Sequence, residues 1–319
     1  MSGKEIHFVT GCAGFIGSNL TDRLLSAGYK VIGYDNFSTG KEKFLENALK
    51  SQNFSLIRGD LLDFDFLKKS LKGGTVWHFA ANADVRFGLQ KPRIDLEQNT
   101  IATSNVLEAA RINGVHTFCF SSTGSIYGEA KITPTPEEHP FPIQTSLYGA
   151  SKLACEGLIE AYCEGFNMRG IIFRFVSILG ERYAHGHVFD FVRQLKKDAK
   201  TLKVLGDGNQ KKSYLYIQDC INACFKALEK TKNKIEIYNL GADEYVSVKD
   251  SISYICARLG VEPALEFSGG NKGWIGDNPF IFLETAKIKS LGWKAGLSIK
   301  EAVEKTVDYL LKNIWILGD

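Results

Sequence analysis

The stretch TGCAGFIGSNL, residues 10–20, decides the fold of this chain. It follows EIHFVT (residues 5–10), a short apolar segment that predicts a strand, and it places glycines at 11, 14 and 17 at the start of a helix. Gly11 permits a tight turn, Gly14 lets the backbone approach a pyrophosphate, and Gly17 lets the helix pack closely against the sheet. Free amide groups at the helix start favour phosphate oxygens. The stretch therefore predicts the first strand, turn and helix of a dinucleotide-binding fold.

A second strand that ends in a carboxylate follows this helix. KVIGYD, residues 30–35, places Asp35 at the end of that strand, at the spacing from Gly17 that dinucleotide-binding folds use. A carboxylate at this position binds the hydroxyls of the adenosine ribose, and it repels a 2′-phosphate. The sequence therefore predicts NAD rather than NADP as the cofactor.

Further strands continue the alternation of strand and helix. SLIRGDLLD (residues 55–63) predicts a third strand and places Asp60 near the adenine, and TVWHFAA (residues 75–81) predicts a fourth strand whose small terminal residues leave room for the cofactor. A helix over 99–113 and a strand over 117–122 follow. Because strands alternate with helices, the fold class is predicted to be α/β with a doubly wound parallel sheet, the Rossmann arrangement.

The second half of the chain alternates less regularly than the first. Its strands and helices predict a smaller C-terminal α/β lobe beside the dinucleotide-binding part. We assign residues 1–172 to an NAD-binding Rossmann domain and residues 173–319 to a substrate-binding lobe, and we expect the two to be partly interleaved.

Composition argues against several classes of protein. The 319 residues, 44% of them hydrophobic, suffice for a large core, and a net charge of +3 without a basic run argues against nucleic-acid binding. No apolar stretch approaches the roughly 20 residues of a membrane span, and the first residues lack the layout of a signal peptide. Seven cysteines without CxxC spacing predict reduced core thiols and no metal site, in a cytoplasmic protein.

A tyrosine, a lysine and a threonine form the candidate catalytic set. Tyr148 and Lys152 in YGASK are four residues apart, so on a helix both project from one face. A free tyrosine ionises near pH ~10, and a neighbouring ammonium lowers that pKa. Thr123 lies in SSTGSIYG (residues 121–128) and adds a hydroxyl. A lone YxxxK is compatible with a buried tyrosine and a solvated lysine, but here it follows a dinucleotide fingerprint, which predicts proton transfer coupled to hydride transfer.

Ordered motifs over nearly the whole length give the chain a family resemblance. It resembles the extended short-chain dehydrogenase/reductase family, in its NAD-dependent nucleotide-sugar epimerase and dehydratase branch, and within that branch the UDP-sugar 4-epimerases. The likeness is carried by TGxxGxxG at 10–17, DNxS at 35–38, GDLxD at 59–63, HxAA at 78–81, SSTxxxYG at 121–128, YGASK at 148–152, LGDGNQ at 205–210, YLYIQD at 214–219 and LGW at 291–293.

The resemblance implies roles for particular residues. Tyr148 would take the proton of a sugar hydroxyl while hydride leaves the same carbon for NAD, Lys152 would hold the nicotinamide ribose, and Thr123 would hydrogen-bond the reacting oxygen. The implied cofactor-binding residues are Gly11, Gly14, Phe15, Ile16, Gly17, Asp35, Asn36, Ser38, Asp60, Leu61, Ala80, Ala81, Asn99, Tyr148 and Lys152. The implied substrate-binding residues are Arg86, Thr123, Ser177, His187, Val188, Lys212, Tyr214 and Asp277.

The two residues after Thr123 separate the subfamilies. The 4,6-dehydratases of this family carry Asp-Glu there, and decarboxylating relatives keep a Glu, because elimination next to a ketone needs an acid and a base. This chain has Gly124 and Ser125, which favours an epimerase acting at C4 through a transient ketone. A nucleotide-sugar 4-reductase and a C2-epimerase of a deoxysugar remain open.

Two alternatives lie outside sugar chemistry. A non-catalytic dinucleotide sensor would typically have lost the tyrosine or the lysine. An oxidoreductase of small alcohols would not need the long C-terminal lobe with LGDGNQ.

The substrate lobe departs from the commonest family pattern at several positions. Ser177 stands where the family usually has a diphosphate-binding asparagine. Lys212 replaces the usual arginine and cannot form a bidentate fork. Trp274, ahead of Asp277, replaces a later arginine. Residues that limit the space beside the sugar align near Ile281, which is intermediate in size. Plain hexoses and N-acetylhexosamines therefore both remain open as substrates.

A uronate sugar is a third possibility for the substrate. A small hydroxyl residue at the Ser177 position, together with ADVRFG at 83–88, is similar to uronate 4-epimerases. Arg86 or Arg182 would then meet the sugar carboxylate bidentately. For Arg86, a salt bridge on the surface or between the lobes is an equally weighted alternative.

The resemblance also implies a homodimer. In the family, two helices from each chain form a four-helix interface. Here they would be the helix from Tyr148 to Gly165, with apolar positions such as Leu158, and the one over 99–113, with Val106 and Ala110. These positions would serve equally well in an internal core.

Overall fold

The computed structural model describes residues 5–82, 87–140, 143–274 and 276–318, and its contacts divide the chain into two compact units. Unit 1 comprises Met1–Ile126, Ser146–Arg174 and Cys224–Tyr238, and unit 2 comprises Tyr127–Thr145, Phe175–Ala223 and Asn239–Asp319. The boundary proposed after residue 172 lies close to the crossing after Arg174. The interleaving expected from the sequence is located by the structure in the segments 127–145 and 224–238.

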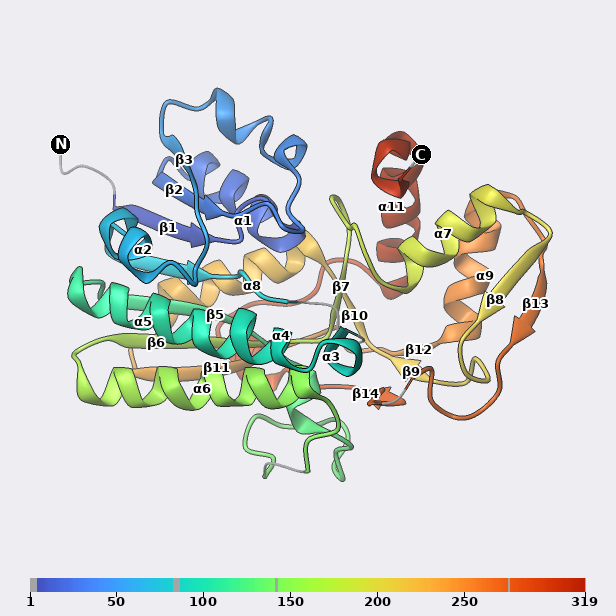
Figure 1. The fold of residues 1–319 in the computed structure, drawn as a ribbon. Coiled ribbons are helices and arrows are strands. Elements are labelled where there is room, and N and C mark those ends of the chain that lie inside the picture. The colour runs from blue at the N-terminus through green and yellow to red at the C-terminus, as the bar shows by residue number, and fades with distance from the viewer. Residues whose placement is uncertain (1–4, 83–86, 141–142, 275, 319) are drawn as a thin grey trace. The chain divides into compact units, whose positions relative to one another are not determined.

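A seven-stranded parallel sheet forms the centre of unit 1, with the strand order β11-β6-β5-β4-β1-β2-β3 (Figure 1). Its strands are β1 (Ile6–Thr10), β2 (Lys30–Asp35), β3 (Phe54–Arg58), β4 (Thr75–His78), β5 (Thr117–Thr123), β6 (Arg169–Phe175) and β11 (Ile235–Leu240). The strand order reverses between β1 and β4, and such switch points bind ligands at the carboxyl ends of the strands. The predicted doubly wound fold is confirmed.

Helices cover both faces of this sheet. Residues in β4 alternate between the faces: Val76 joins a core cluster with the helices α2 (Phe64–Ser70), α5 (Ala102–Ile112) and α6 (Leu147–Gly165). Trp77 points the other way and stacks on Phe225 of α8 (Ile217–Lys230), and Arg23 of α1 (Phe15–Ser26) lies over the same ring. Burial on both faces explains the apolar character of the strands.

The helix predicted over 99–113 has a different beginning in the structure. Two short helices, α3 (Phe87–Gln90) and α4 (Arg93–Asp95), precede one turn of π-helix over Leu96–Ile101, which leads directly into α5. Such turns occur mostly as single insertions and often at functional sites. Asn99, a predicted cofactor residue, lies in this turn.

The two apolar residues of α5 that the sequence offered for a dimer interface are in the core. Val106 and Ala110 are completely buried within the cluster between the sheet and α2, α5 and α6. Of the two alternatives that the sequence left open for these residues, the internal core is the one observed, because the apolar face of α5 is covered by its own sheet.

Unit 2 is a smaller α/β assembly of short sheets and helices. Its strands are β7 (Ser177–Leu179) parallel to β10 (Tyr214–Tyr216), β9 (Lys211–Lys212) between β12 (Val246–Ser247) and β14 (Phe280–Ile281), and β8 (Thr201–Val204) parallel to β13 (Ala264–Phe267). Its helices are α7 (His187–Lys197), α9 (Val248–Leu259), α10 (Ala286–Ser290) and α11 (Ile299–Lys312).

Capping residues fix where the longer helices of unit 2 begin. Ser247 at α9 and Ser298 at α11 each accept a backbone N–H, from Asp250 and Glu301, and those two carboxylates bond back to the cap. Both helices contact each other and α7. Among the described residues, no helix has the length and apolar character needed to cross a membrane.

Candidate active site

The glycine turn after β1 has the geometry that the sequence predicts. Gly11 has a φ of +70°, and a Cβ on it would lie 2.7 Å from the Ala80 nitrogen. A Cβ on Gly17 would lie 2.1 Å from the Gly11 oxygen, so the helix packs directly on the turn. Gly14, the N-cap of α1, offers no side-chain cap, and the first turn carries no acidic residue. Phe15 and Ile16 therefore begin a helix whose positive end is available to an anion.

Asp35 at the end of β2 is held by two backbone amides. Its Oδ2 accepts the Ala13 N–H at 2.9 Å and its Oδ1 accepts the Phe37 N–H at 2.8 Å. Burial raises the pKa of this carboxyl, and the two amide bonds act in the opposite direction. The bond to Ala13 connects the carboxylate directly to the glycine turn. The predicted ribose contact and the predicted phosphate contact are therefore held at a fixed distance from each other.

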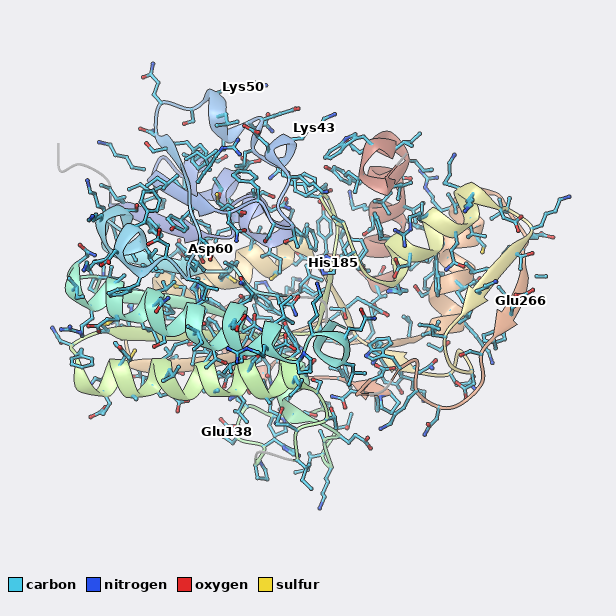
Figure 2. The ribbon with its side chains drawn as sticks, viewed as in Figure 1. Lys43, Lys50, Asp60, Glu138, His185 and Glu266 are labelled. Atoms are coloured by element: carbon cyan, nitrogen blue, oxygen red, sulfur yellow. The ribbon has the colours of Figure 1, made fainter. Side chains whose placement is uncertain are left out.

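Four predicted cofactor-binding residues gather at the ends of β2 and β3. Asn36 Nδ2 donates to Asp60 Oδ2 at 3.0 Å, and Asn36 Oδ1 accepts the Ser38 N–H. The Leu61 carbonyl accepts from Asn105 of α5 at 2.8 Å. Asp60 is labelled in Figure 2, as are Lys43 and Lys50 on the segment that joins β2 to β3. The four predicted residues therefore form one group, although their contacts with a cofactor stay a prediction.

The Ala80–Ala81 edge is tied to β1 through a buried threonine. Thr10 Oγ1 accepts the N–H groups of Phe79 and Ala80, both at 3.2 Å, and lies 2.7 Å from His78 Nδ1. Since the oxygen accepts two N–H groups, its proton goes to His78 Nδ1, and Nε2–H donates to Thr103 at 2.9 Å. Burial lowers the pKa of His78 to about 3, so the ring is neutral.

The three predicted catalytic residues lie together in unit 1. Tyr148 and Lys152 project from one face of α6, which begins where Ser146 accepts the Gly149 N–H. Thr123 at the end of β5 acts to lower the pKa of Tyr148, and it is itself held by Ser125, whose N–H donates to Thr123 Oγ1 at 3.1 Å. Lys152, only 2% exposed, donates from Nζ to the Ser121 carbonyl at 2.8 Å.

Burial shifts the two titrating groups in opposite directions. It raises the pKa of Tyr148 to about 12, while the bond to Thr123 acts the other way. It lowers the pKa of Lys152 to about 8, although the neighbouring Cys155, Glu156 and Asp95 act to raise that pKa. In the chain without cofactor, the net direction for Tyr148 is therefore opposite to the predicted lowering, because desolvation of the phenolate exceeds the other effects.

The side chain of Asn99 connects the π-helical turn to α6. It is buried, its Oδ1 accepts the Asn82 N–H at 2.8 Å, and its Nδ2 donates to Ser151 Oγ at 2.9 Å and, over a longer 3.3 Å, to Asp95 Oδ1. Ser151 in turn donates to the Tyr148 carbonyl at 2.8 Å. These bonds orient the first turn of α6, and a direct contact of Asn99 with the cofactor stays a prediction.

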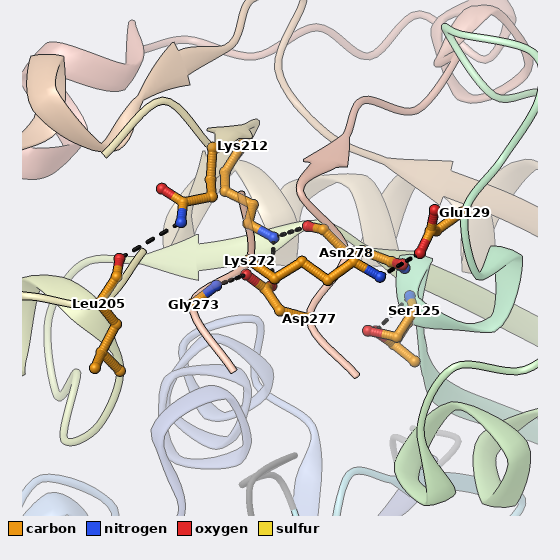
Figure 3. A network of polar contacts seen from close by, with 10 residues as sticks. Ser125, Glu129, Leu205, Lys212, Lys272, Gly273, Asp277 and Asn278 are labelled. Atoms are coloured by element: carbon orange, nitrogen blue, oxygen red, sulfur yellow. Dashed lines mark hydrogen bonds and ion pairs between the residues drawn. The ribbon is translucent and has the colours of Figure 1, made fainter. Parts of the chain in front are cut away.

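Two of the predicted substrate residues form an ion pair in unit 2. Lys212 Nζ lies 2.9 Å from Asp277 Oδ1 and also donates to the Asn278 carbonyl, and Asp277 Oδ2 accepts the Gly273 N–H at 3.0 Å (Figure 3). Burial lowers the pKa of Lys212, and Asp277 opposes this shift. Lys272, the other nearby cation, pairs with Glu129 (Figure 3).

The remaining predicted substrate residues have different surroundings. Ser177 is exposed on β7, opposite Tyr214 of β10 in the parallel register. His187, whose pKa burial lowers to about 3, bonds Ser251 at 2.7 Å, and Val188 is completely buried. Arg86 lies outside the described residues.

Sequence reasoning missed the residues that hold the site in place. Thr10 opens the TGxxGxxG motif and His78 opens the HxAA motif, but the sequence did not show that the two side chains connect strands far apart in the chain. Glu156, which accepts from Ser122 and Arg174, follows Lys152 by one helical turn. Its spacing of four residues was a signal that could have been followed.

The glycine turn, Asp35 and the Tyr148–Lys152 pair define a dinucleotide-binding oxidoreductase-type site. An open helix N-terminus and a braced carboxylate fit the pyrophosphate and adenosine ribose of NAD.

Comparison with known proteins agrees with this class. The family model described as "NAD dependent epimerase/dehydratase family" matches residues 7–241. A UDP-galactose 4-epimerase structure is 35% identical, with a TM-score of 0.88 and coverage of 97% of this chain and 100% of its own. The UDP-glucuronic acid 4-epimerase of Bacillus cereus, solved with UDP-glucuronic acid and NAD, is 30% identical, with a TM-score of 0.87 and coverage of 96% and 99%. The UDP-glucose 4-epimerase of Mycolicibacterium smegmatis is 29% identical, with coverage of 94% and 97%.

The chain belongs to the NAD-dependent epimerase/dehydratase family, and NAD is its cofactor.

Proposed function

We propose that this protein is a UDP-sugar 4-epimerase that oxidises C4 of the sugar and returns the hydride to the opposite face of the ketone. One observation carries the proposal. Thr123, Tyr148 and Lys152 lie together, and the two residues that follow Thr123 are Gly124 and Ser125. Neither of these two residues can supply the acid or base that dehydration requires. Ser125 instead holds the Thr123 hydroxyl, so its role is to orient that group.

The chain's own residues would move one proton and position the sugar. When bound, NAD accepts the hydride from C4 and gives it back. Tyr148 Oη takes the proton of the C4 hydroxyl as base and returns it to the oxygen after the ketone has turned over. Thr123 Oγ1 hydrogen-bonds the same oxygen. Burial raises the pKa of Tyr148. Lys152 Nζ, a buried cation, would hold the nicotinamide ribose and would favour the phenolate.

The substrate class rests on unit 2. Lys212 and Asp277 form a pair in which the cation would meet the diphosphate and the carboxylate would accept from a ribose hydroxyl. Ile281 pairs with Lys212 in the parallel register of β14 and β9, which places a medium-sized side chain near the proposed phosphate contact. UDP-hexoses, UDP-N-acetylhexosamines and UDP-uronates are the three candidates. The 4-epimerases named above act on members of this set.

Proton NMR of the purified protein with a panel of these UDP-sugars, without added cofactor, tests the proposal. The C4 epimer of one sugar should appear, which also requires that NAD remains bound between turnovers. The Tyr148→Phe variant serves as the control. If bound NAD is demonstrated and no C4 epimer forms from any sugar, the 4-epimerase assignment is wrong, and assays for a 4-reductase and a C2-epimerase follow.

We also propose that the protein is a homodimer formed through α5 and α6. Their outward sides carry exposed apolar residues, with Ile112 at 47% and Leu147 at 45% exposure, and Ile101 precedes α5 with 45%. Light scattering after size exclusion should give twice the chain mass. The Ile112→Lys change should lower it toward the mass of one chain, because it places a charge within the apolar contact.

A further inference from the structure

Three consecutive residues at the end of β5 contact three residues spaced one turn apart on α6. The Ser121 carbonyl accepts from Lys152, the Ser122 hydroxyl donates to Glu156, and Thr123 lies near enough to Tyr148 to act on its pKa. Positions 148, 152 and 156 share one helix face. Along β5, the contacts of Lys152 and Tyr148 lie on either side of the Ser122–Glu156 contact, which touches neither substrate nor cofactor in the proposed mechanism.

Glu156 in this middle contact is also paired with a buried arginine. Arg174 of β6 donates from Nη2 to Glu156 Oε2 at 2.7 Å and from Nε to both oxygens at 3.1 and 3.2 Å. The side chains of Arg174 and Glu156 are 1% and 2% exposed. An apolar pair of similar volume would avoid the cost of burying two charges, and the best-attested use of such a pair is to fix one arrangement.

We infer that Glu156, anchored by Arg174, is a positioning residue that holds the end of β5 against α6 so that Thr123, Tyr148 and Lys152 stay in reacting geometry. The Ser122 bond fixes the strand, and the Arg174 bonds fix the helix to the neighbouring strand β6. The expected effect on kcat rests on the proposed function. The expected effect on the pKa of Lys152 does not, because it concerns the folded, NAD-loaded chain alone.

The charged and titratable groups around Lys152 set the sign of the expected effect. They are Cys155 and Glu156 from α6, Asp95 from α4 and His78 from β4, and the Phe120 ring lies 4.6 Å from Nζ. Glu156 is among the groups that raise the pKa of Lys152. Removing its charge should therefore make Lys152 lose its proton at lower pH.

The test compares Glu156→Gln with Glu160→Gln, the same change one turn further along α6. NMR of ¹³Cε-labelled lysine follows the titration of Lys152, whose signal is assigned by its loss in Lys152→Met. Glu156→Gln should titrate at lower pH than the unmodified protein, and Glu160→Gln should not. With the active UDP-sugar, kcat of Glu156→Gln should fall about 100-fold, with KM and bound NAD changed by less than about threefold, since a small misplacement of reacting groups costs that much.

An unchanged Lys152 titration and an unchanged kcat in a folded Glu156→Gln protein would overturn the inference. If that variant does not fold, Ser122→Ala decides, because it removes one bond and leaves the Glu156–Arg174 pair intact. It should lower kcat about tenfold without loss of NAD. An unchanged kcat in Ser122→Ala would contradict the positioning role. Should no UDP-sugar be turned over at all, the proposed function fails, and the Lys152 titration still tests the positioning.

Discussion

Burial acts in opposite directions on Tyr148 and Lys152, because the phenol is neutral and the ammonium charged when protonated. Without cofactor, Tyr148 is a weak acid whose pKa lies near 12, held in place by Thr123. The residue becomes a base only when positive charge next to it outweighs its desolvation. In the proposed mechanism, Lys152 and the nicotinamide of bound NAD would supply that charge.

At this residue, Tyr148→Phe removes the proton acceptor and leaves the ring in place. We expect kcat to fall about 10²- to 10⁴-fold, the usual contribution of a general acid or base. Bound NAD should be retained, since the glycine turn and Asp35 are untouched. The epimer yield by NMR and the NAD content of the denatured protein are the two measurements. A variant with near-normal turnover would remove Tyr148 from its assigned role.

Asp35 is the residue that we expect to govern the choice between NAD and NADP. Asp35→Ala deletes the carboxylate that Ala13 and Phe37 orient, so NAD should bind about tenfold more weakly, the loss expected for one charge-assisted hydrogen bond. Discrimination against NADP should relax, because the charge that repels a 2′-phosphate is gone. Titration calorimetry of the cofactor-free protein with NAD and NADP measures both. An unchanged preference would refute the assignment.

At the scale of elements, the glycine turn after β1 and the end of β4 depend on one hydroxyl. Thr10 joins the Ala80 N–H to His78, and a Cβ at Gly11 would collide with Ala80, so the two segments are fixed at close range. Residues far apart in the sequence thus set the width of the predicted cofactor groove.

Thr10→Val keeps the shape of the side chain but leaves the Ala80 N–H and His78 Nδ1 without their partner. We expect the free energy of unfolding to drop by about 1–3 kcal/mol, the cost of buried polar groups that lose a hydrogen bond. NAD should also bind more weakly because the Ala80 edge is no longer held. Urea unfolding and NAD titration measure the two effects. Thr10→Ser keeps the hydroxyl and is the matched control, so equal losses in both variants would contradict the explanation.

At the scale of the whole molecule, three histidines make stability depend on pH. Burial lowers the pKa of His7 to about 4 and those of His78 and His187 to about 3, all below the unfolded value of about 6.5. Above pH ~6.5 both states are neutral at these positions and nothing changes. As the pH falls below that value, the unfolded chain takes up protons that the folded chain does not, so stability is lost progressively down to the folded pKa values.

The His7→Asn variant isolates one of these contributions. His7 Nδ1 accepts from Trp77 at 2.9 Å, and an asparagine oxygen can replace that acceptor without titrating. Between pH 6 and pH 5, the unmodified protein should lose roughly 1 kcal/mol more unfolding free energy than the variant, about one proton's worth. Urea unfolding at the two pH values gives the comparison. Parallel pH dependences would show that His7 is not neutral in the folded state.

The elements of the NAD-binding half could be predicted from local spacing in the sequence. Three glycines, a strand ending in Asp35 and a Tyr–Lys pair one turn apart are short-range patterns, and each is set by the geometry of a single turn, strand or helix. The start of the helix over 99–113 could not be predicted, because the π-helical turn at Leu96–Ile101 leaves no periodic pattern in the sequence.

The sequence by itself predicted the doubly wound fold, NAD as the cofactor and the candidate catalytic trio, since each of these rests on patterns within one or two neighbouring elements. Tertiary structure alone decided which side of α5 is covered, so that Val106 lies in the core, and which distant groups brace the site. The Thr10–His78 and Glu156–Arg174 contacts join segments that meet only when the sheet assembles. Their energies depend on burial, and burial is a property of the folded chain rather than of any stretch of its sequence.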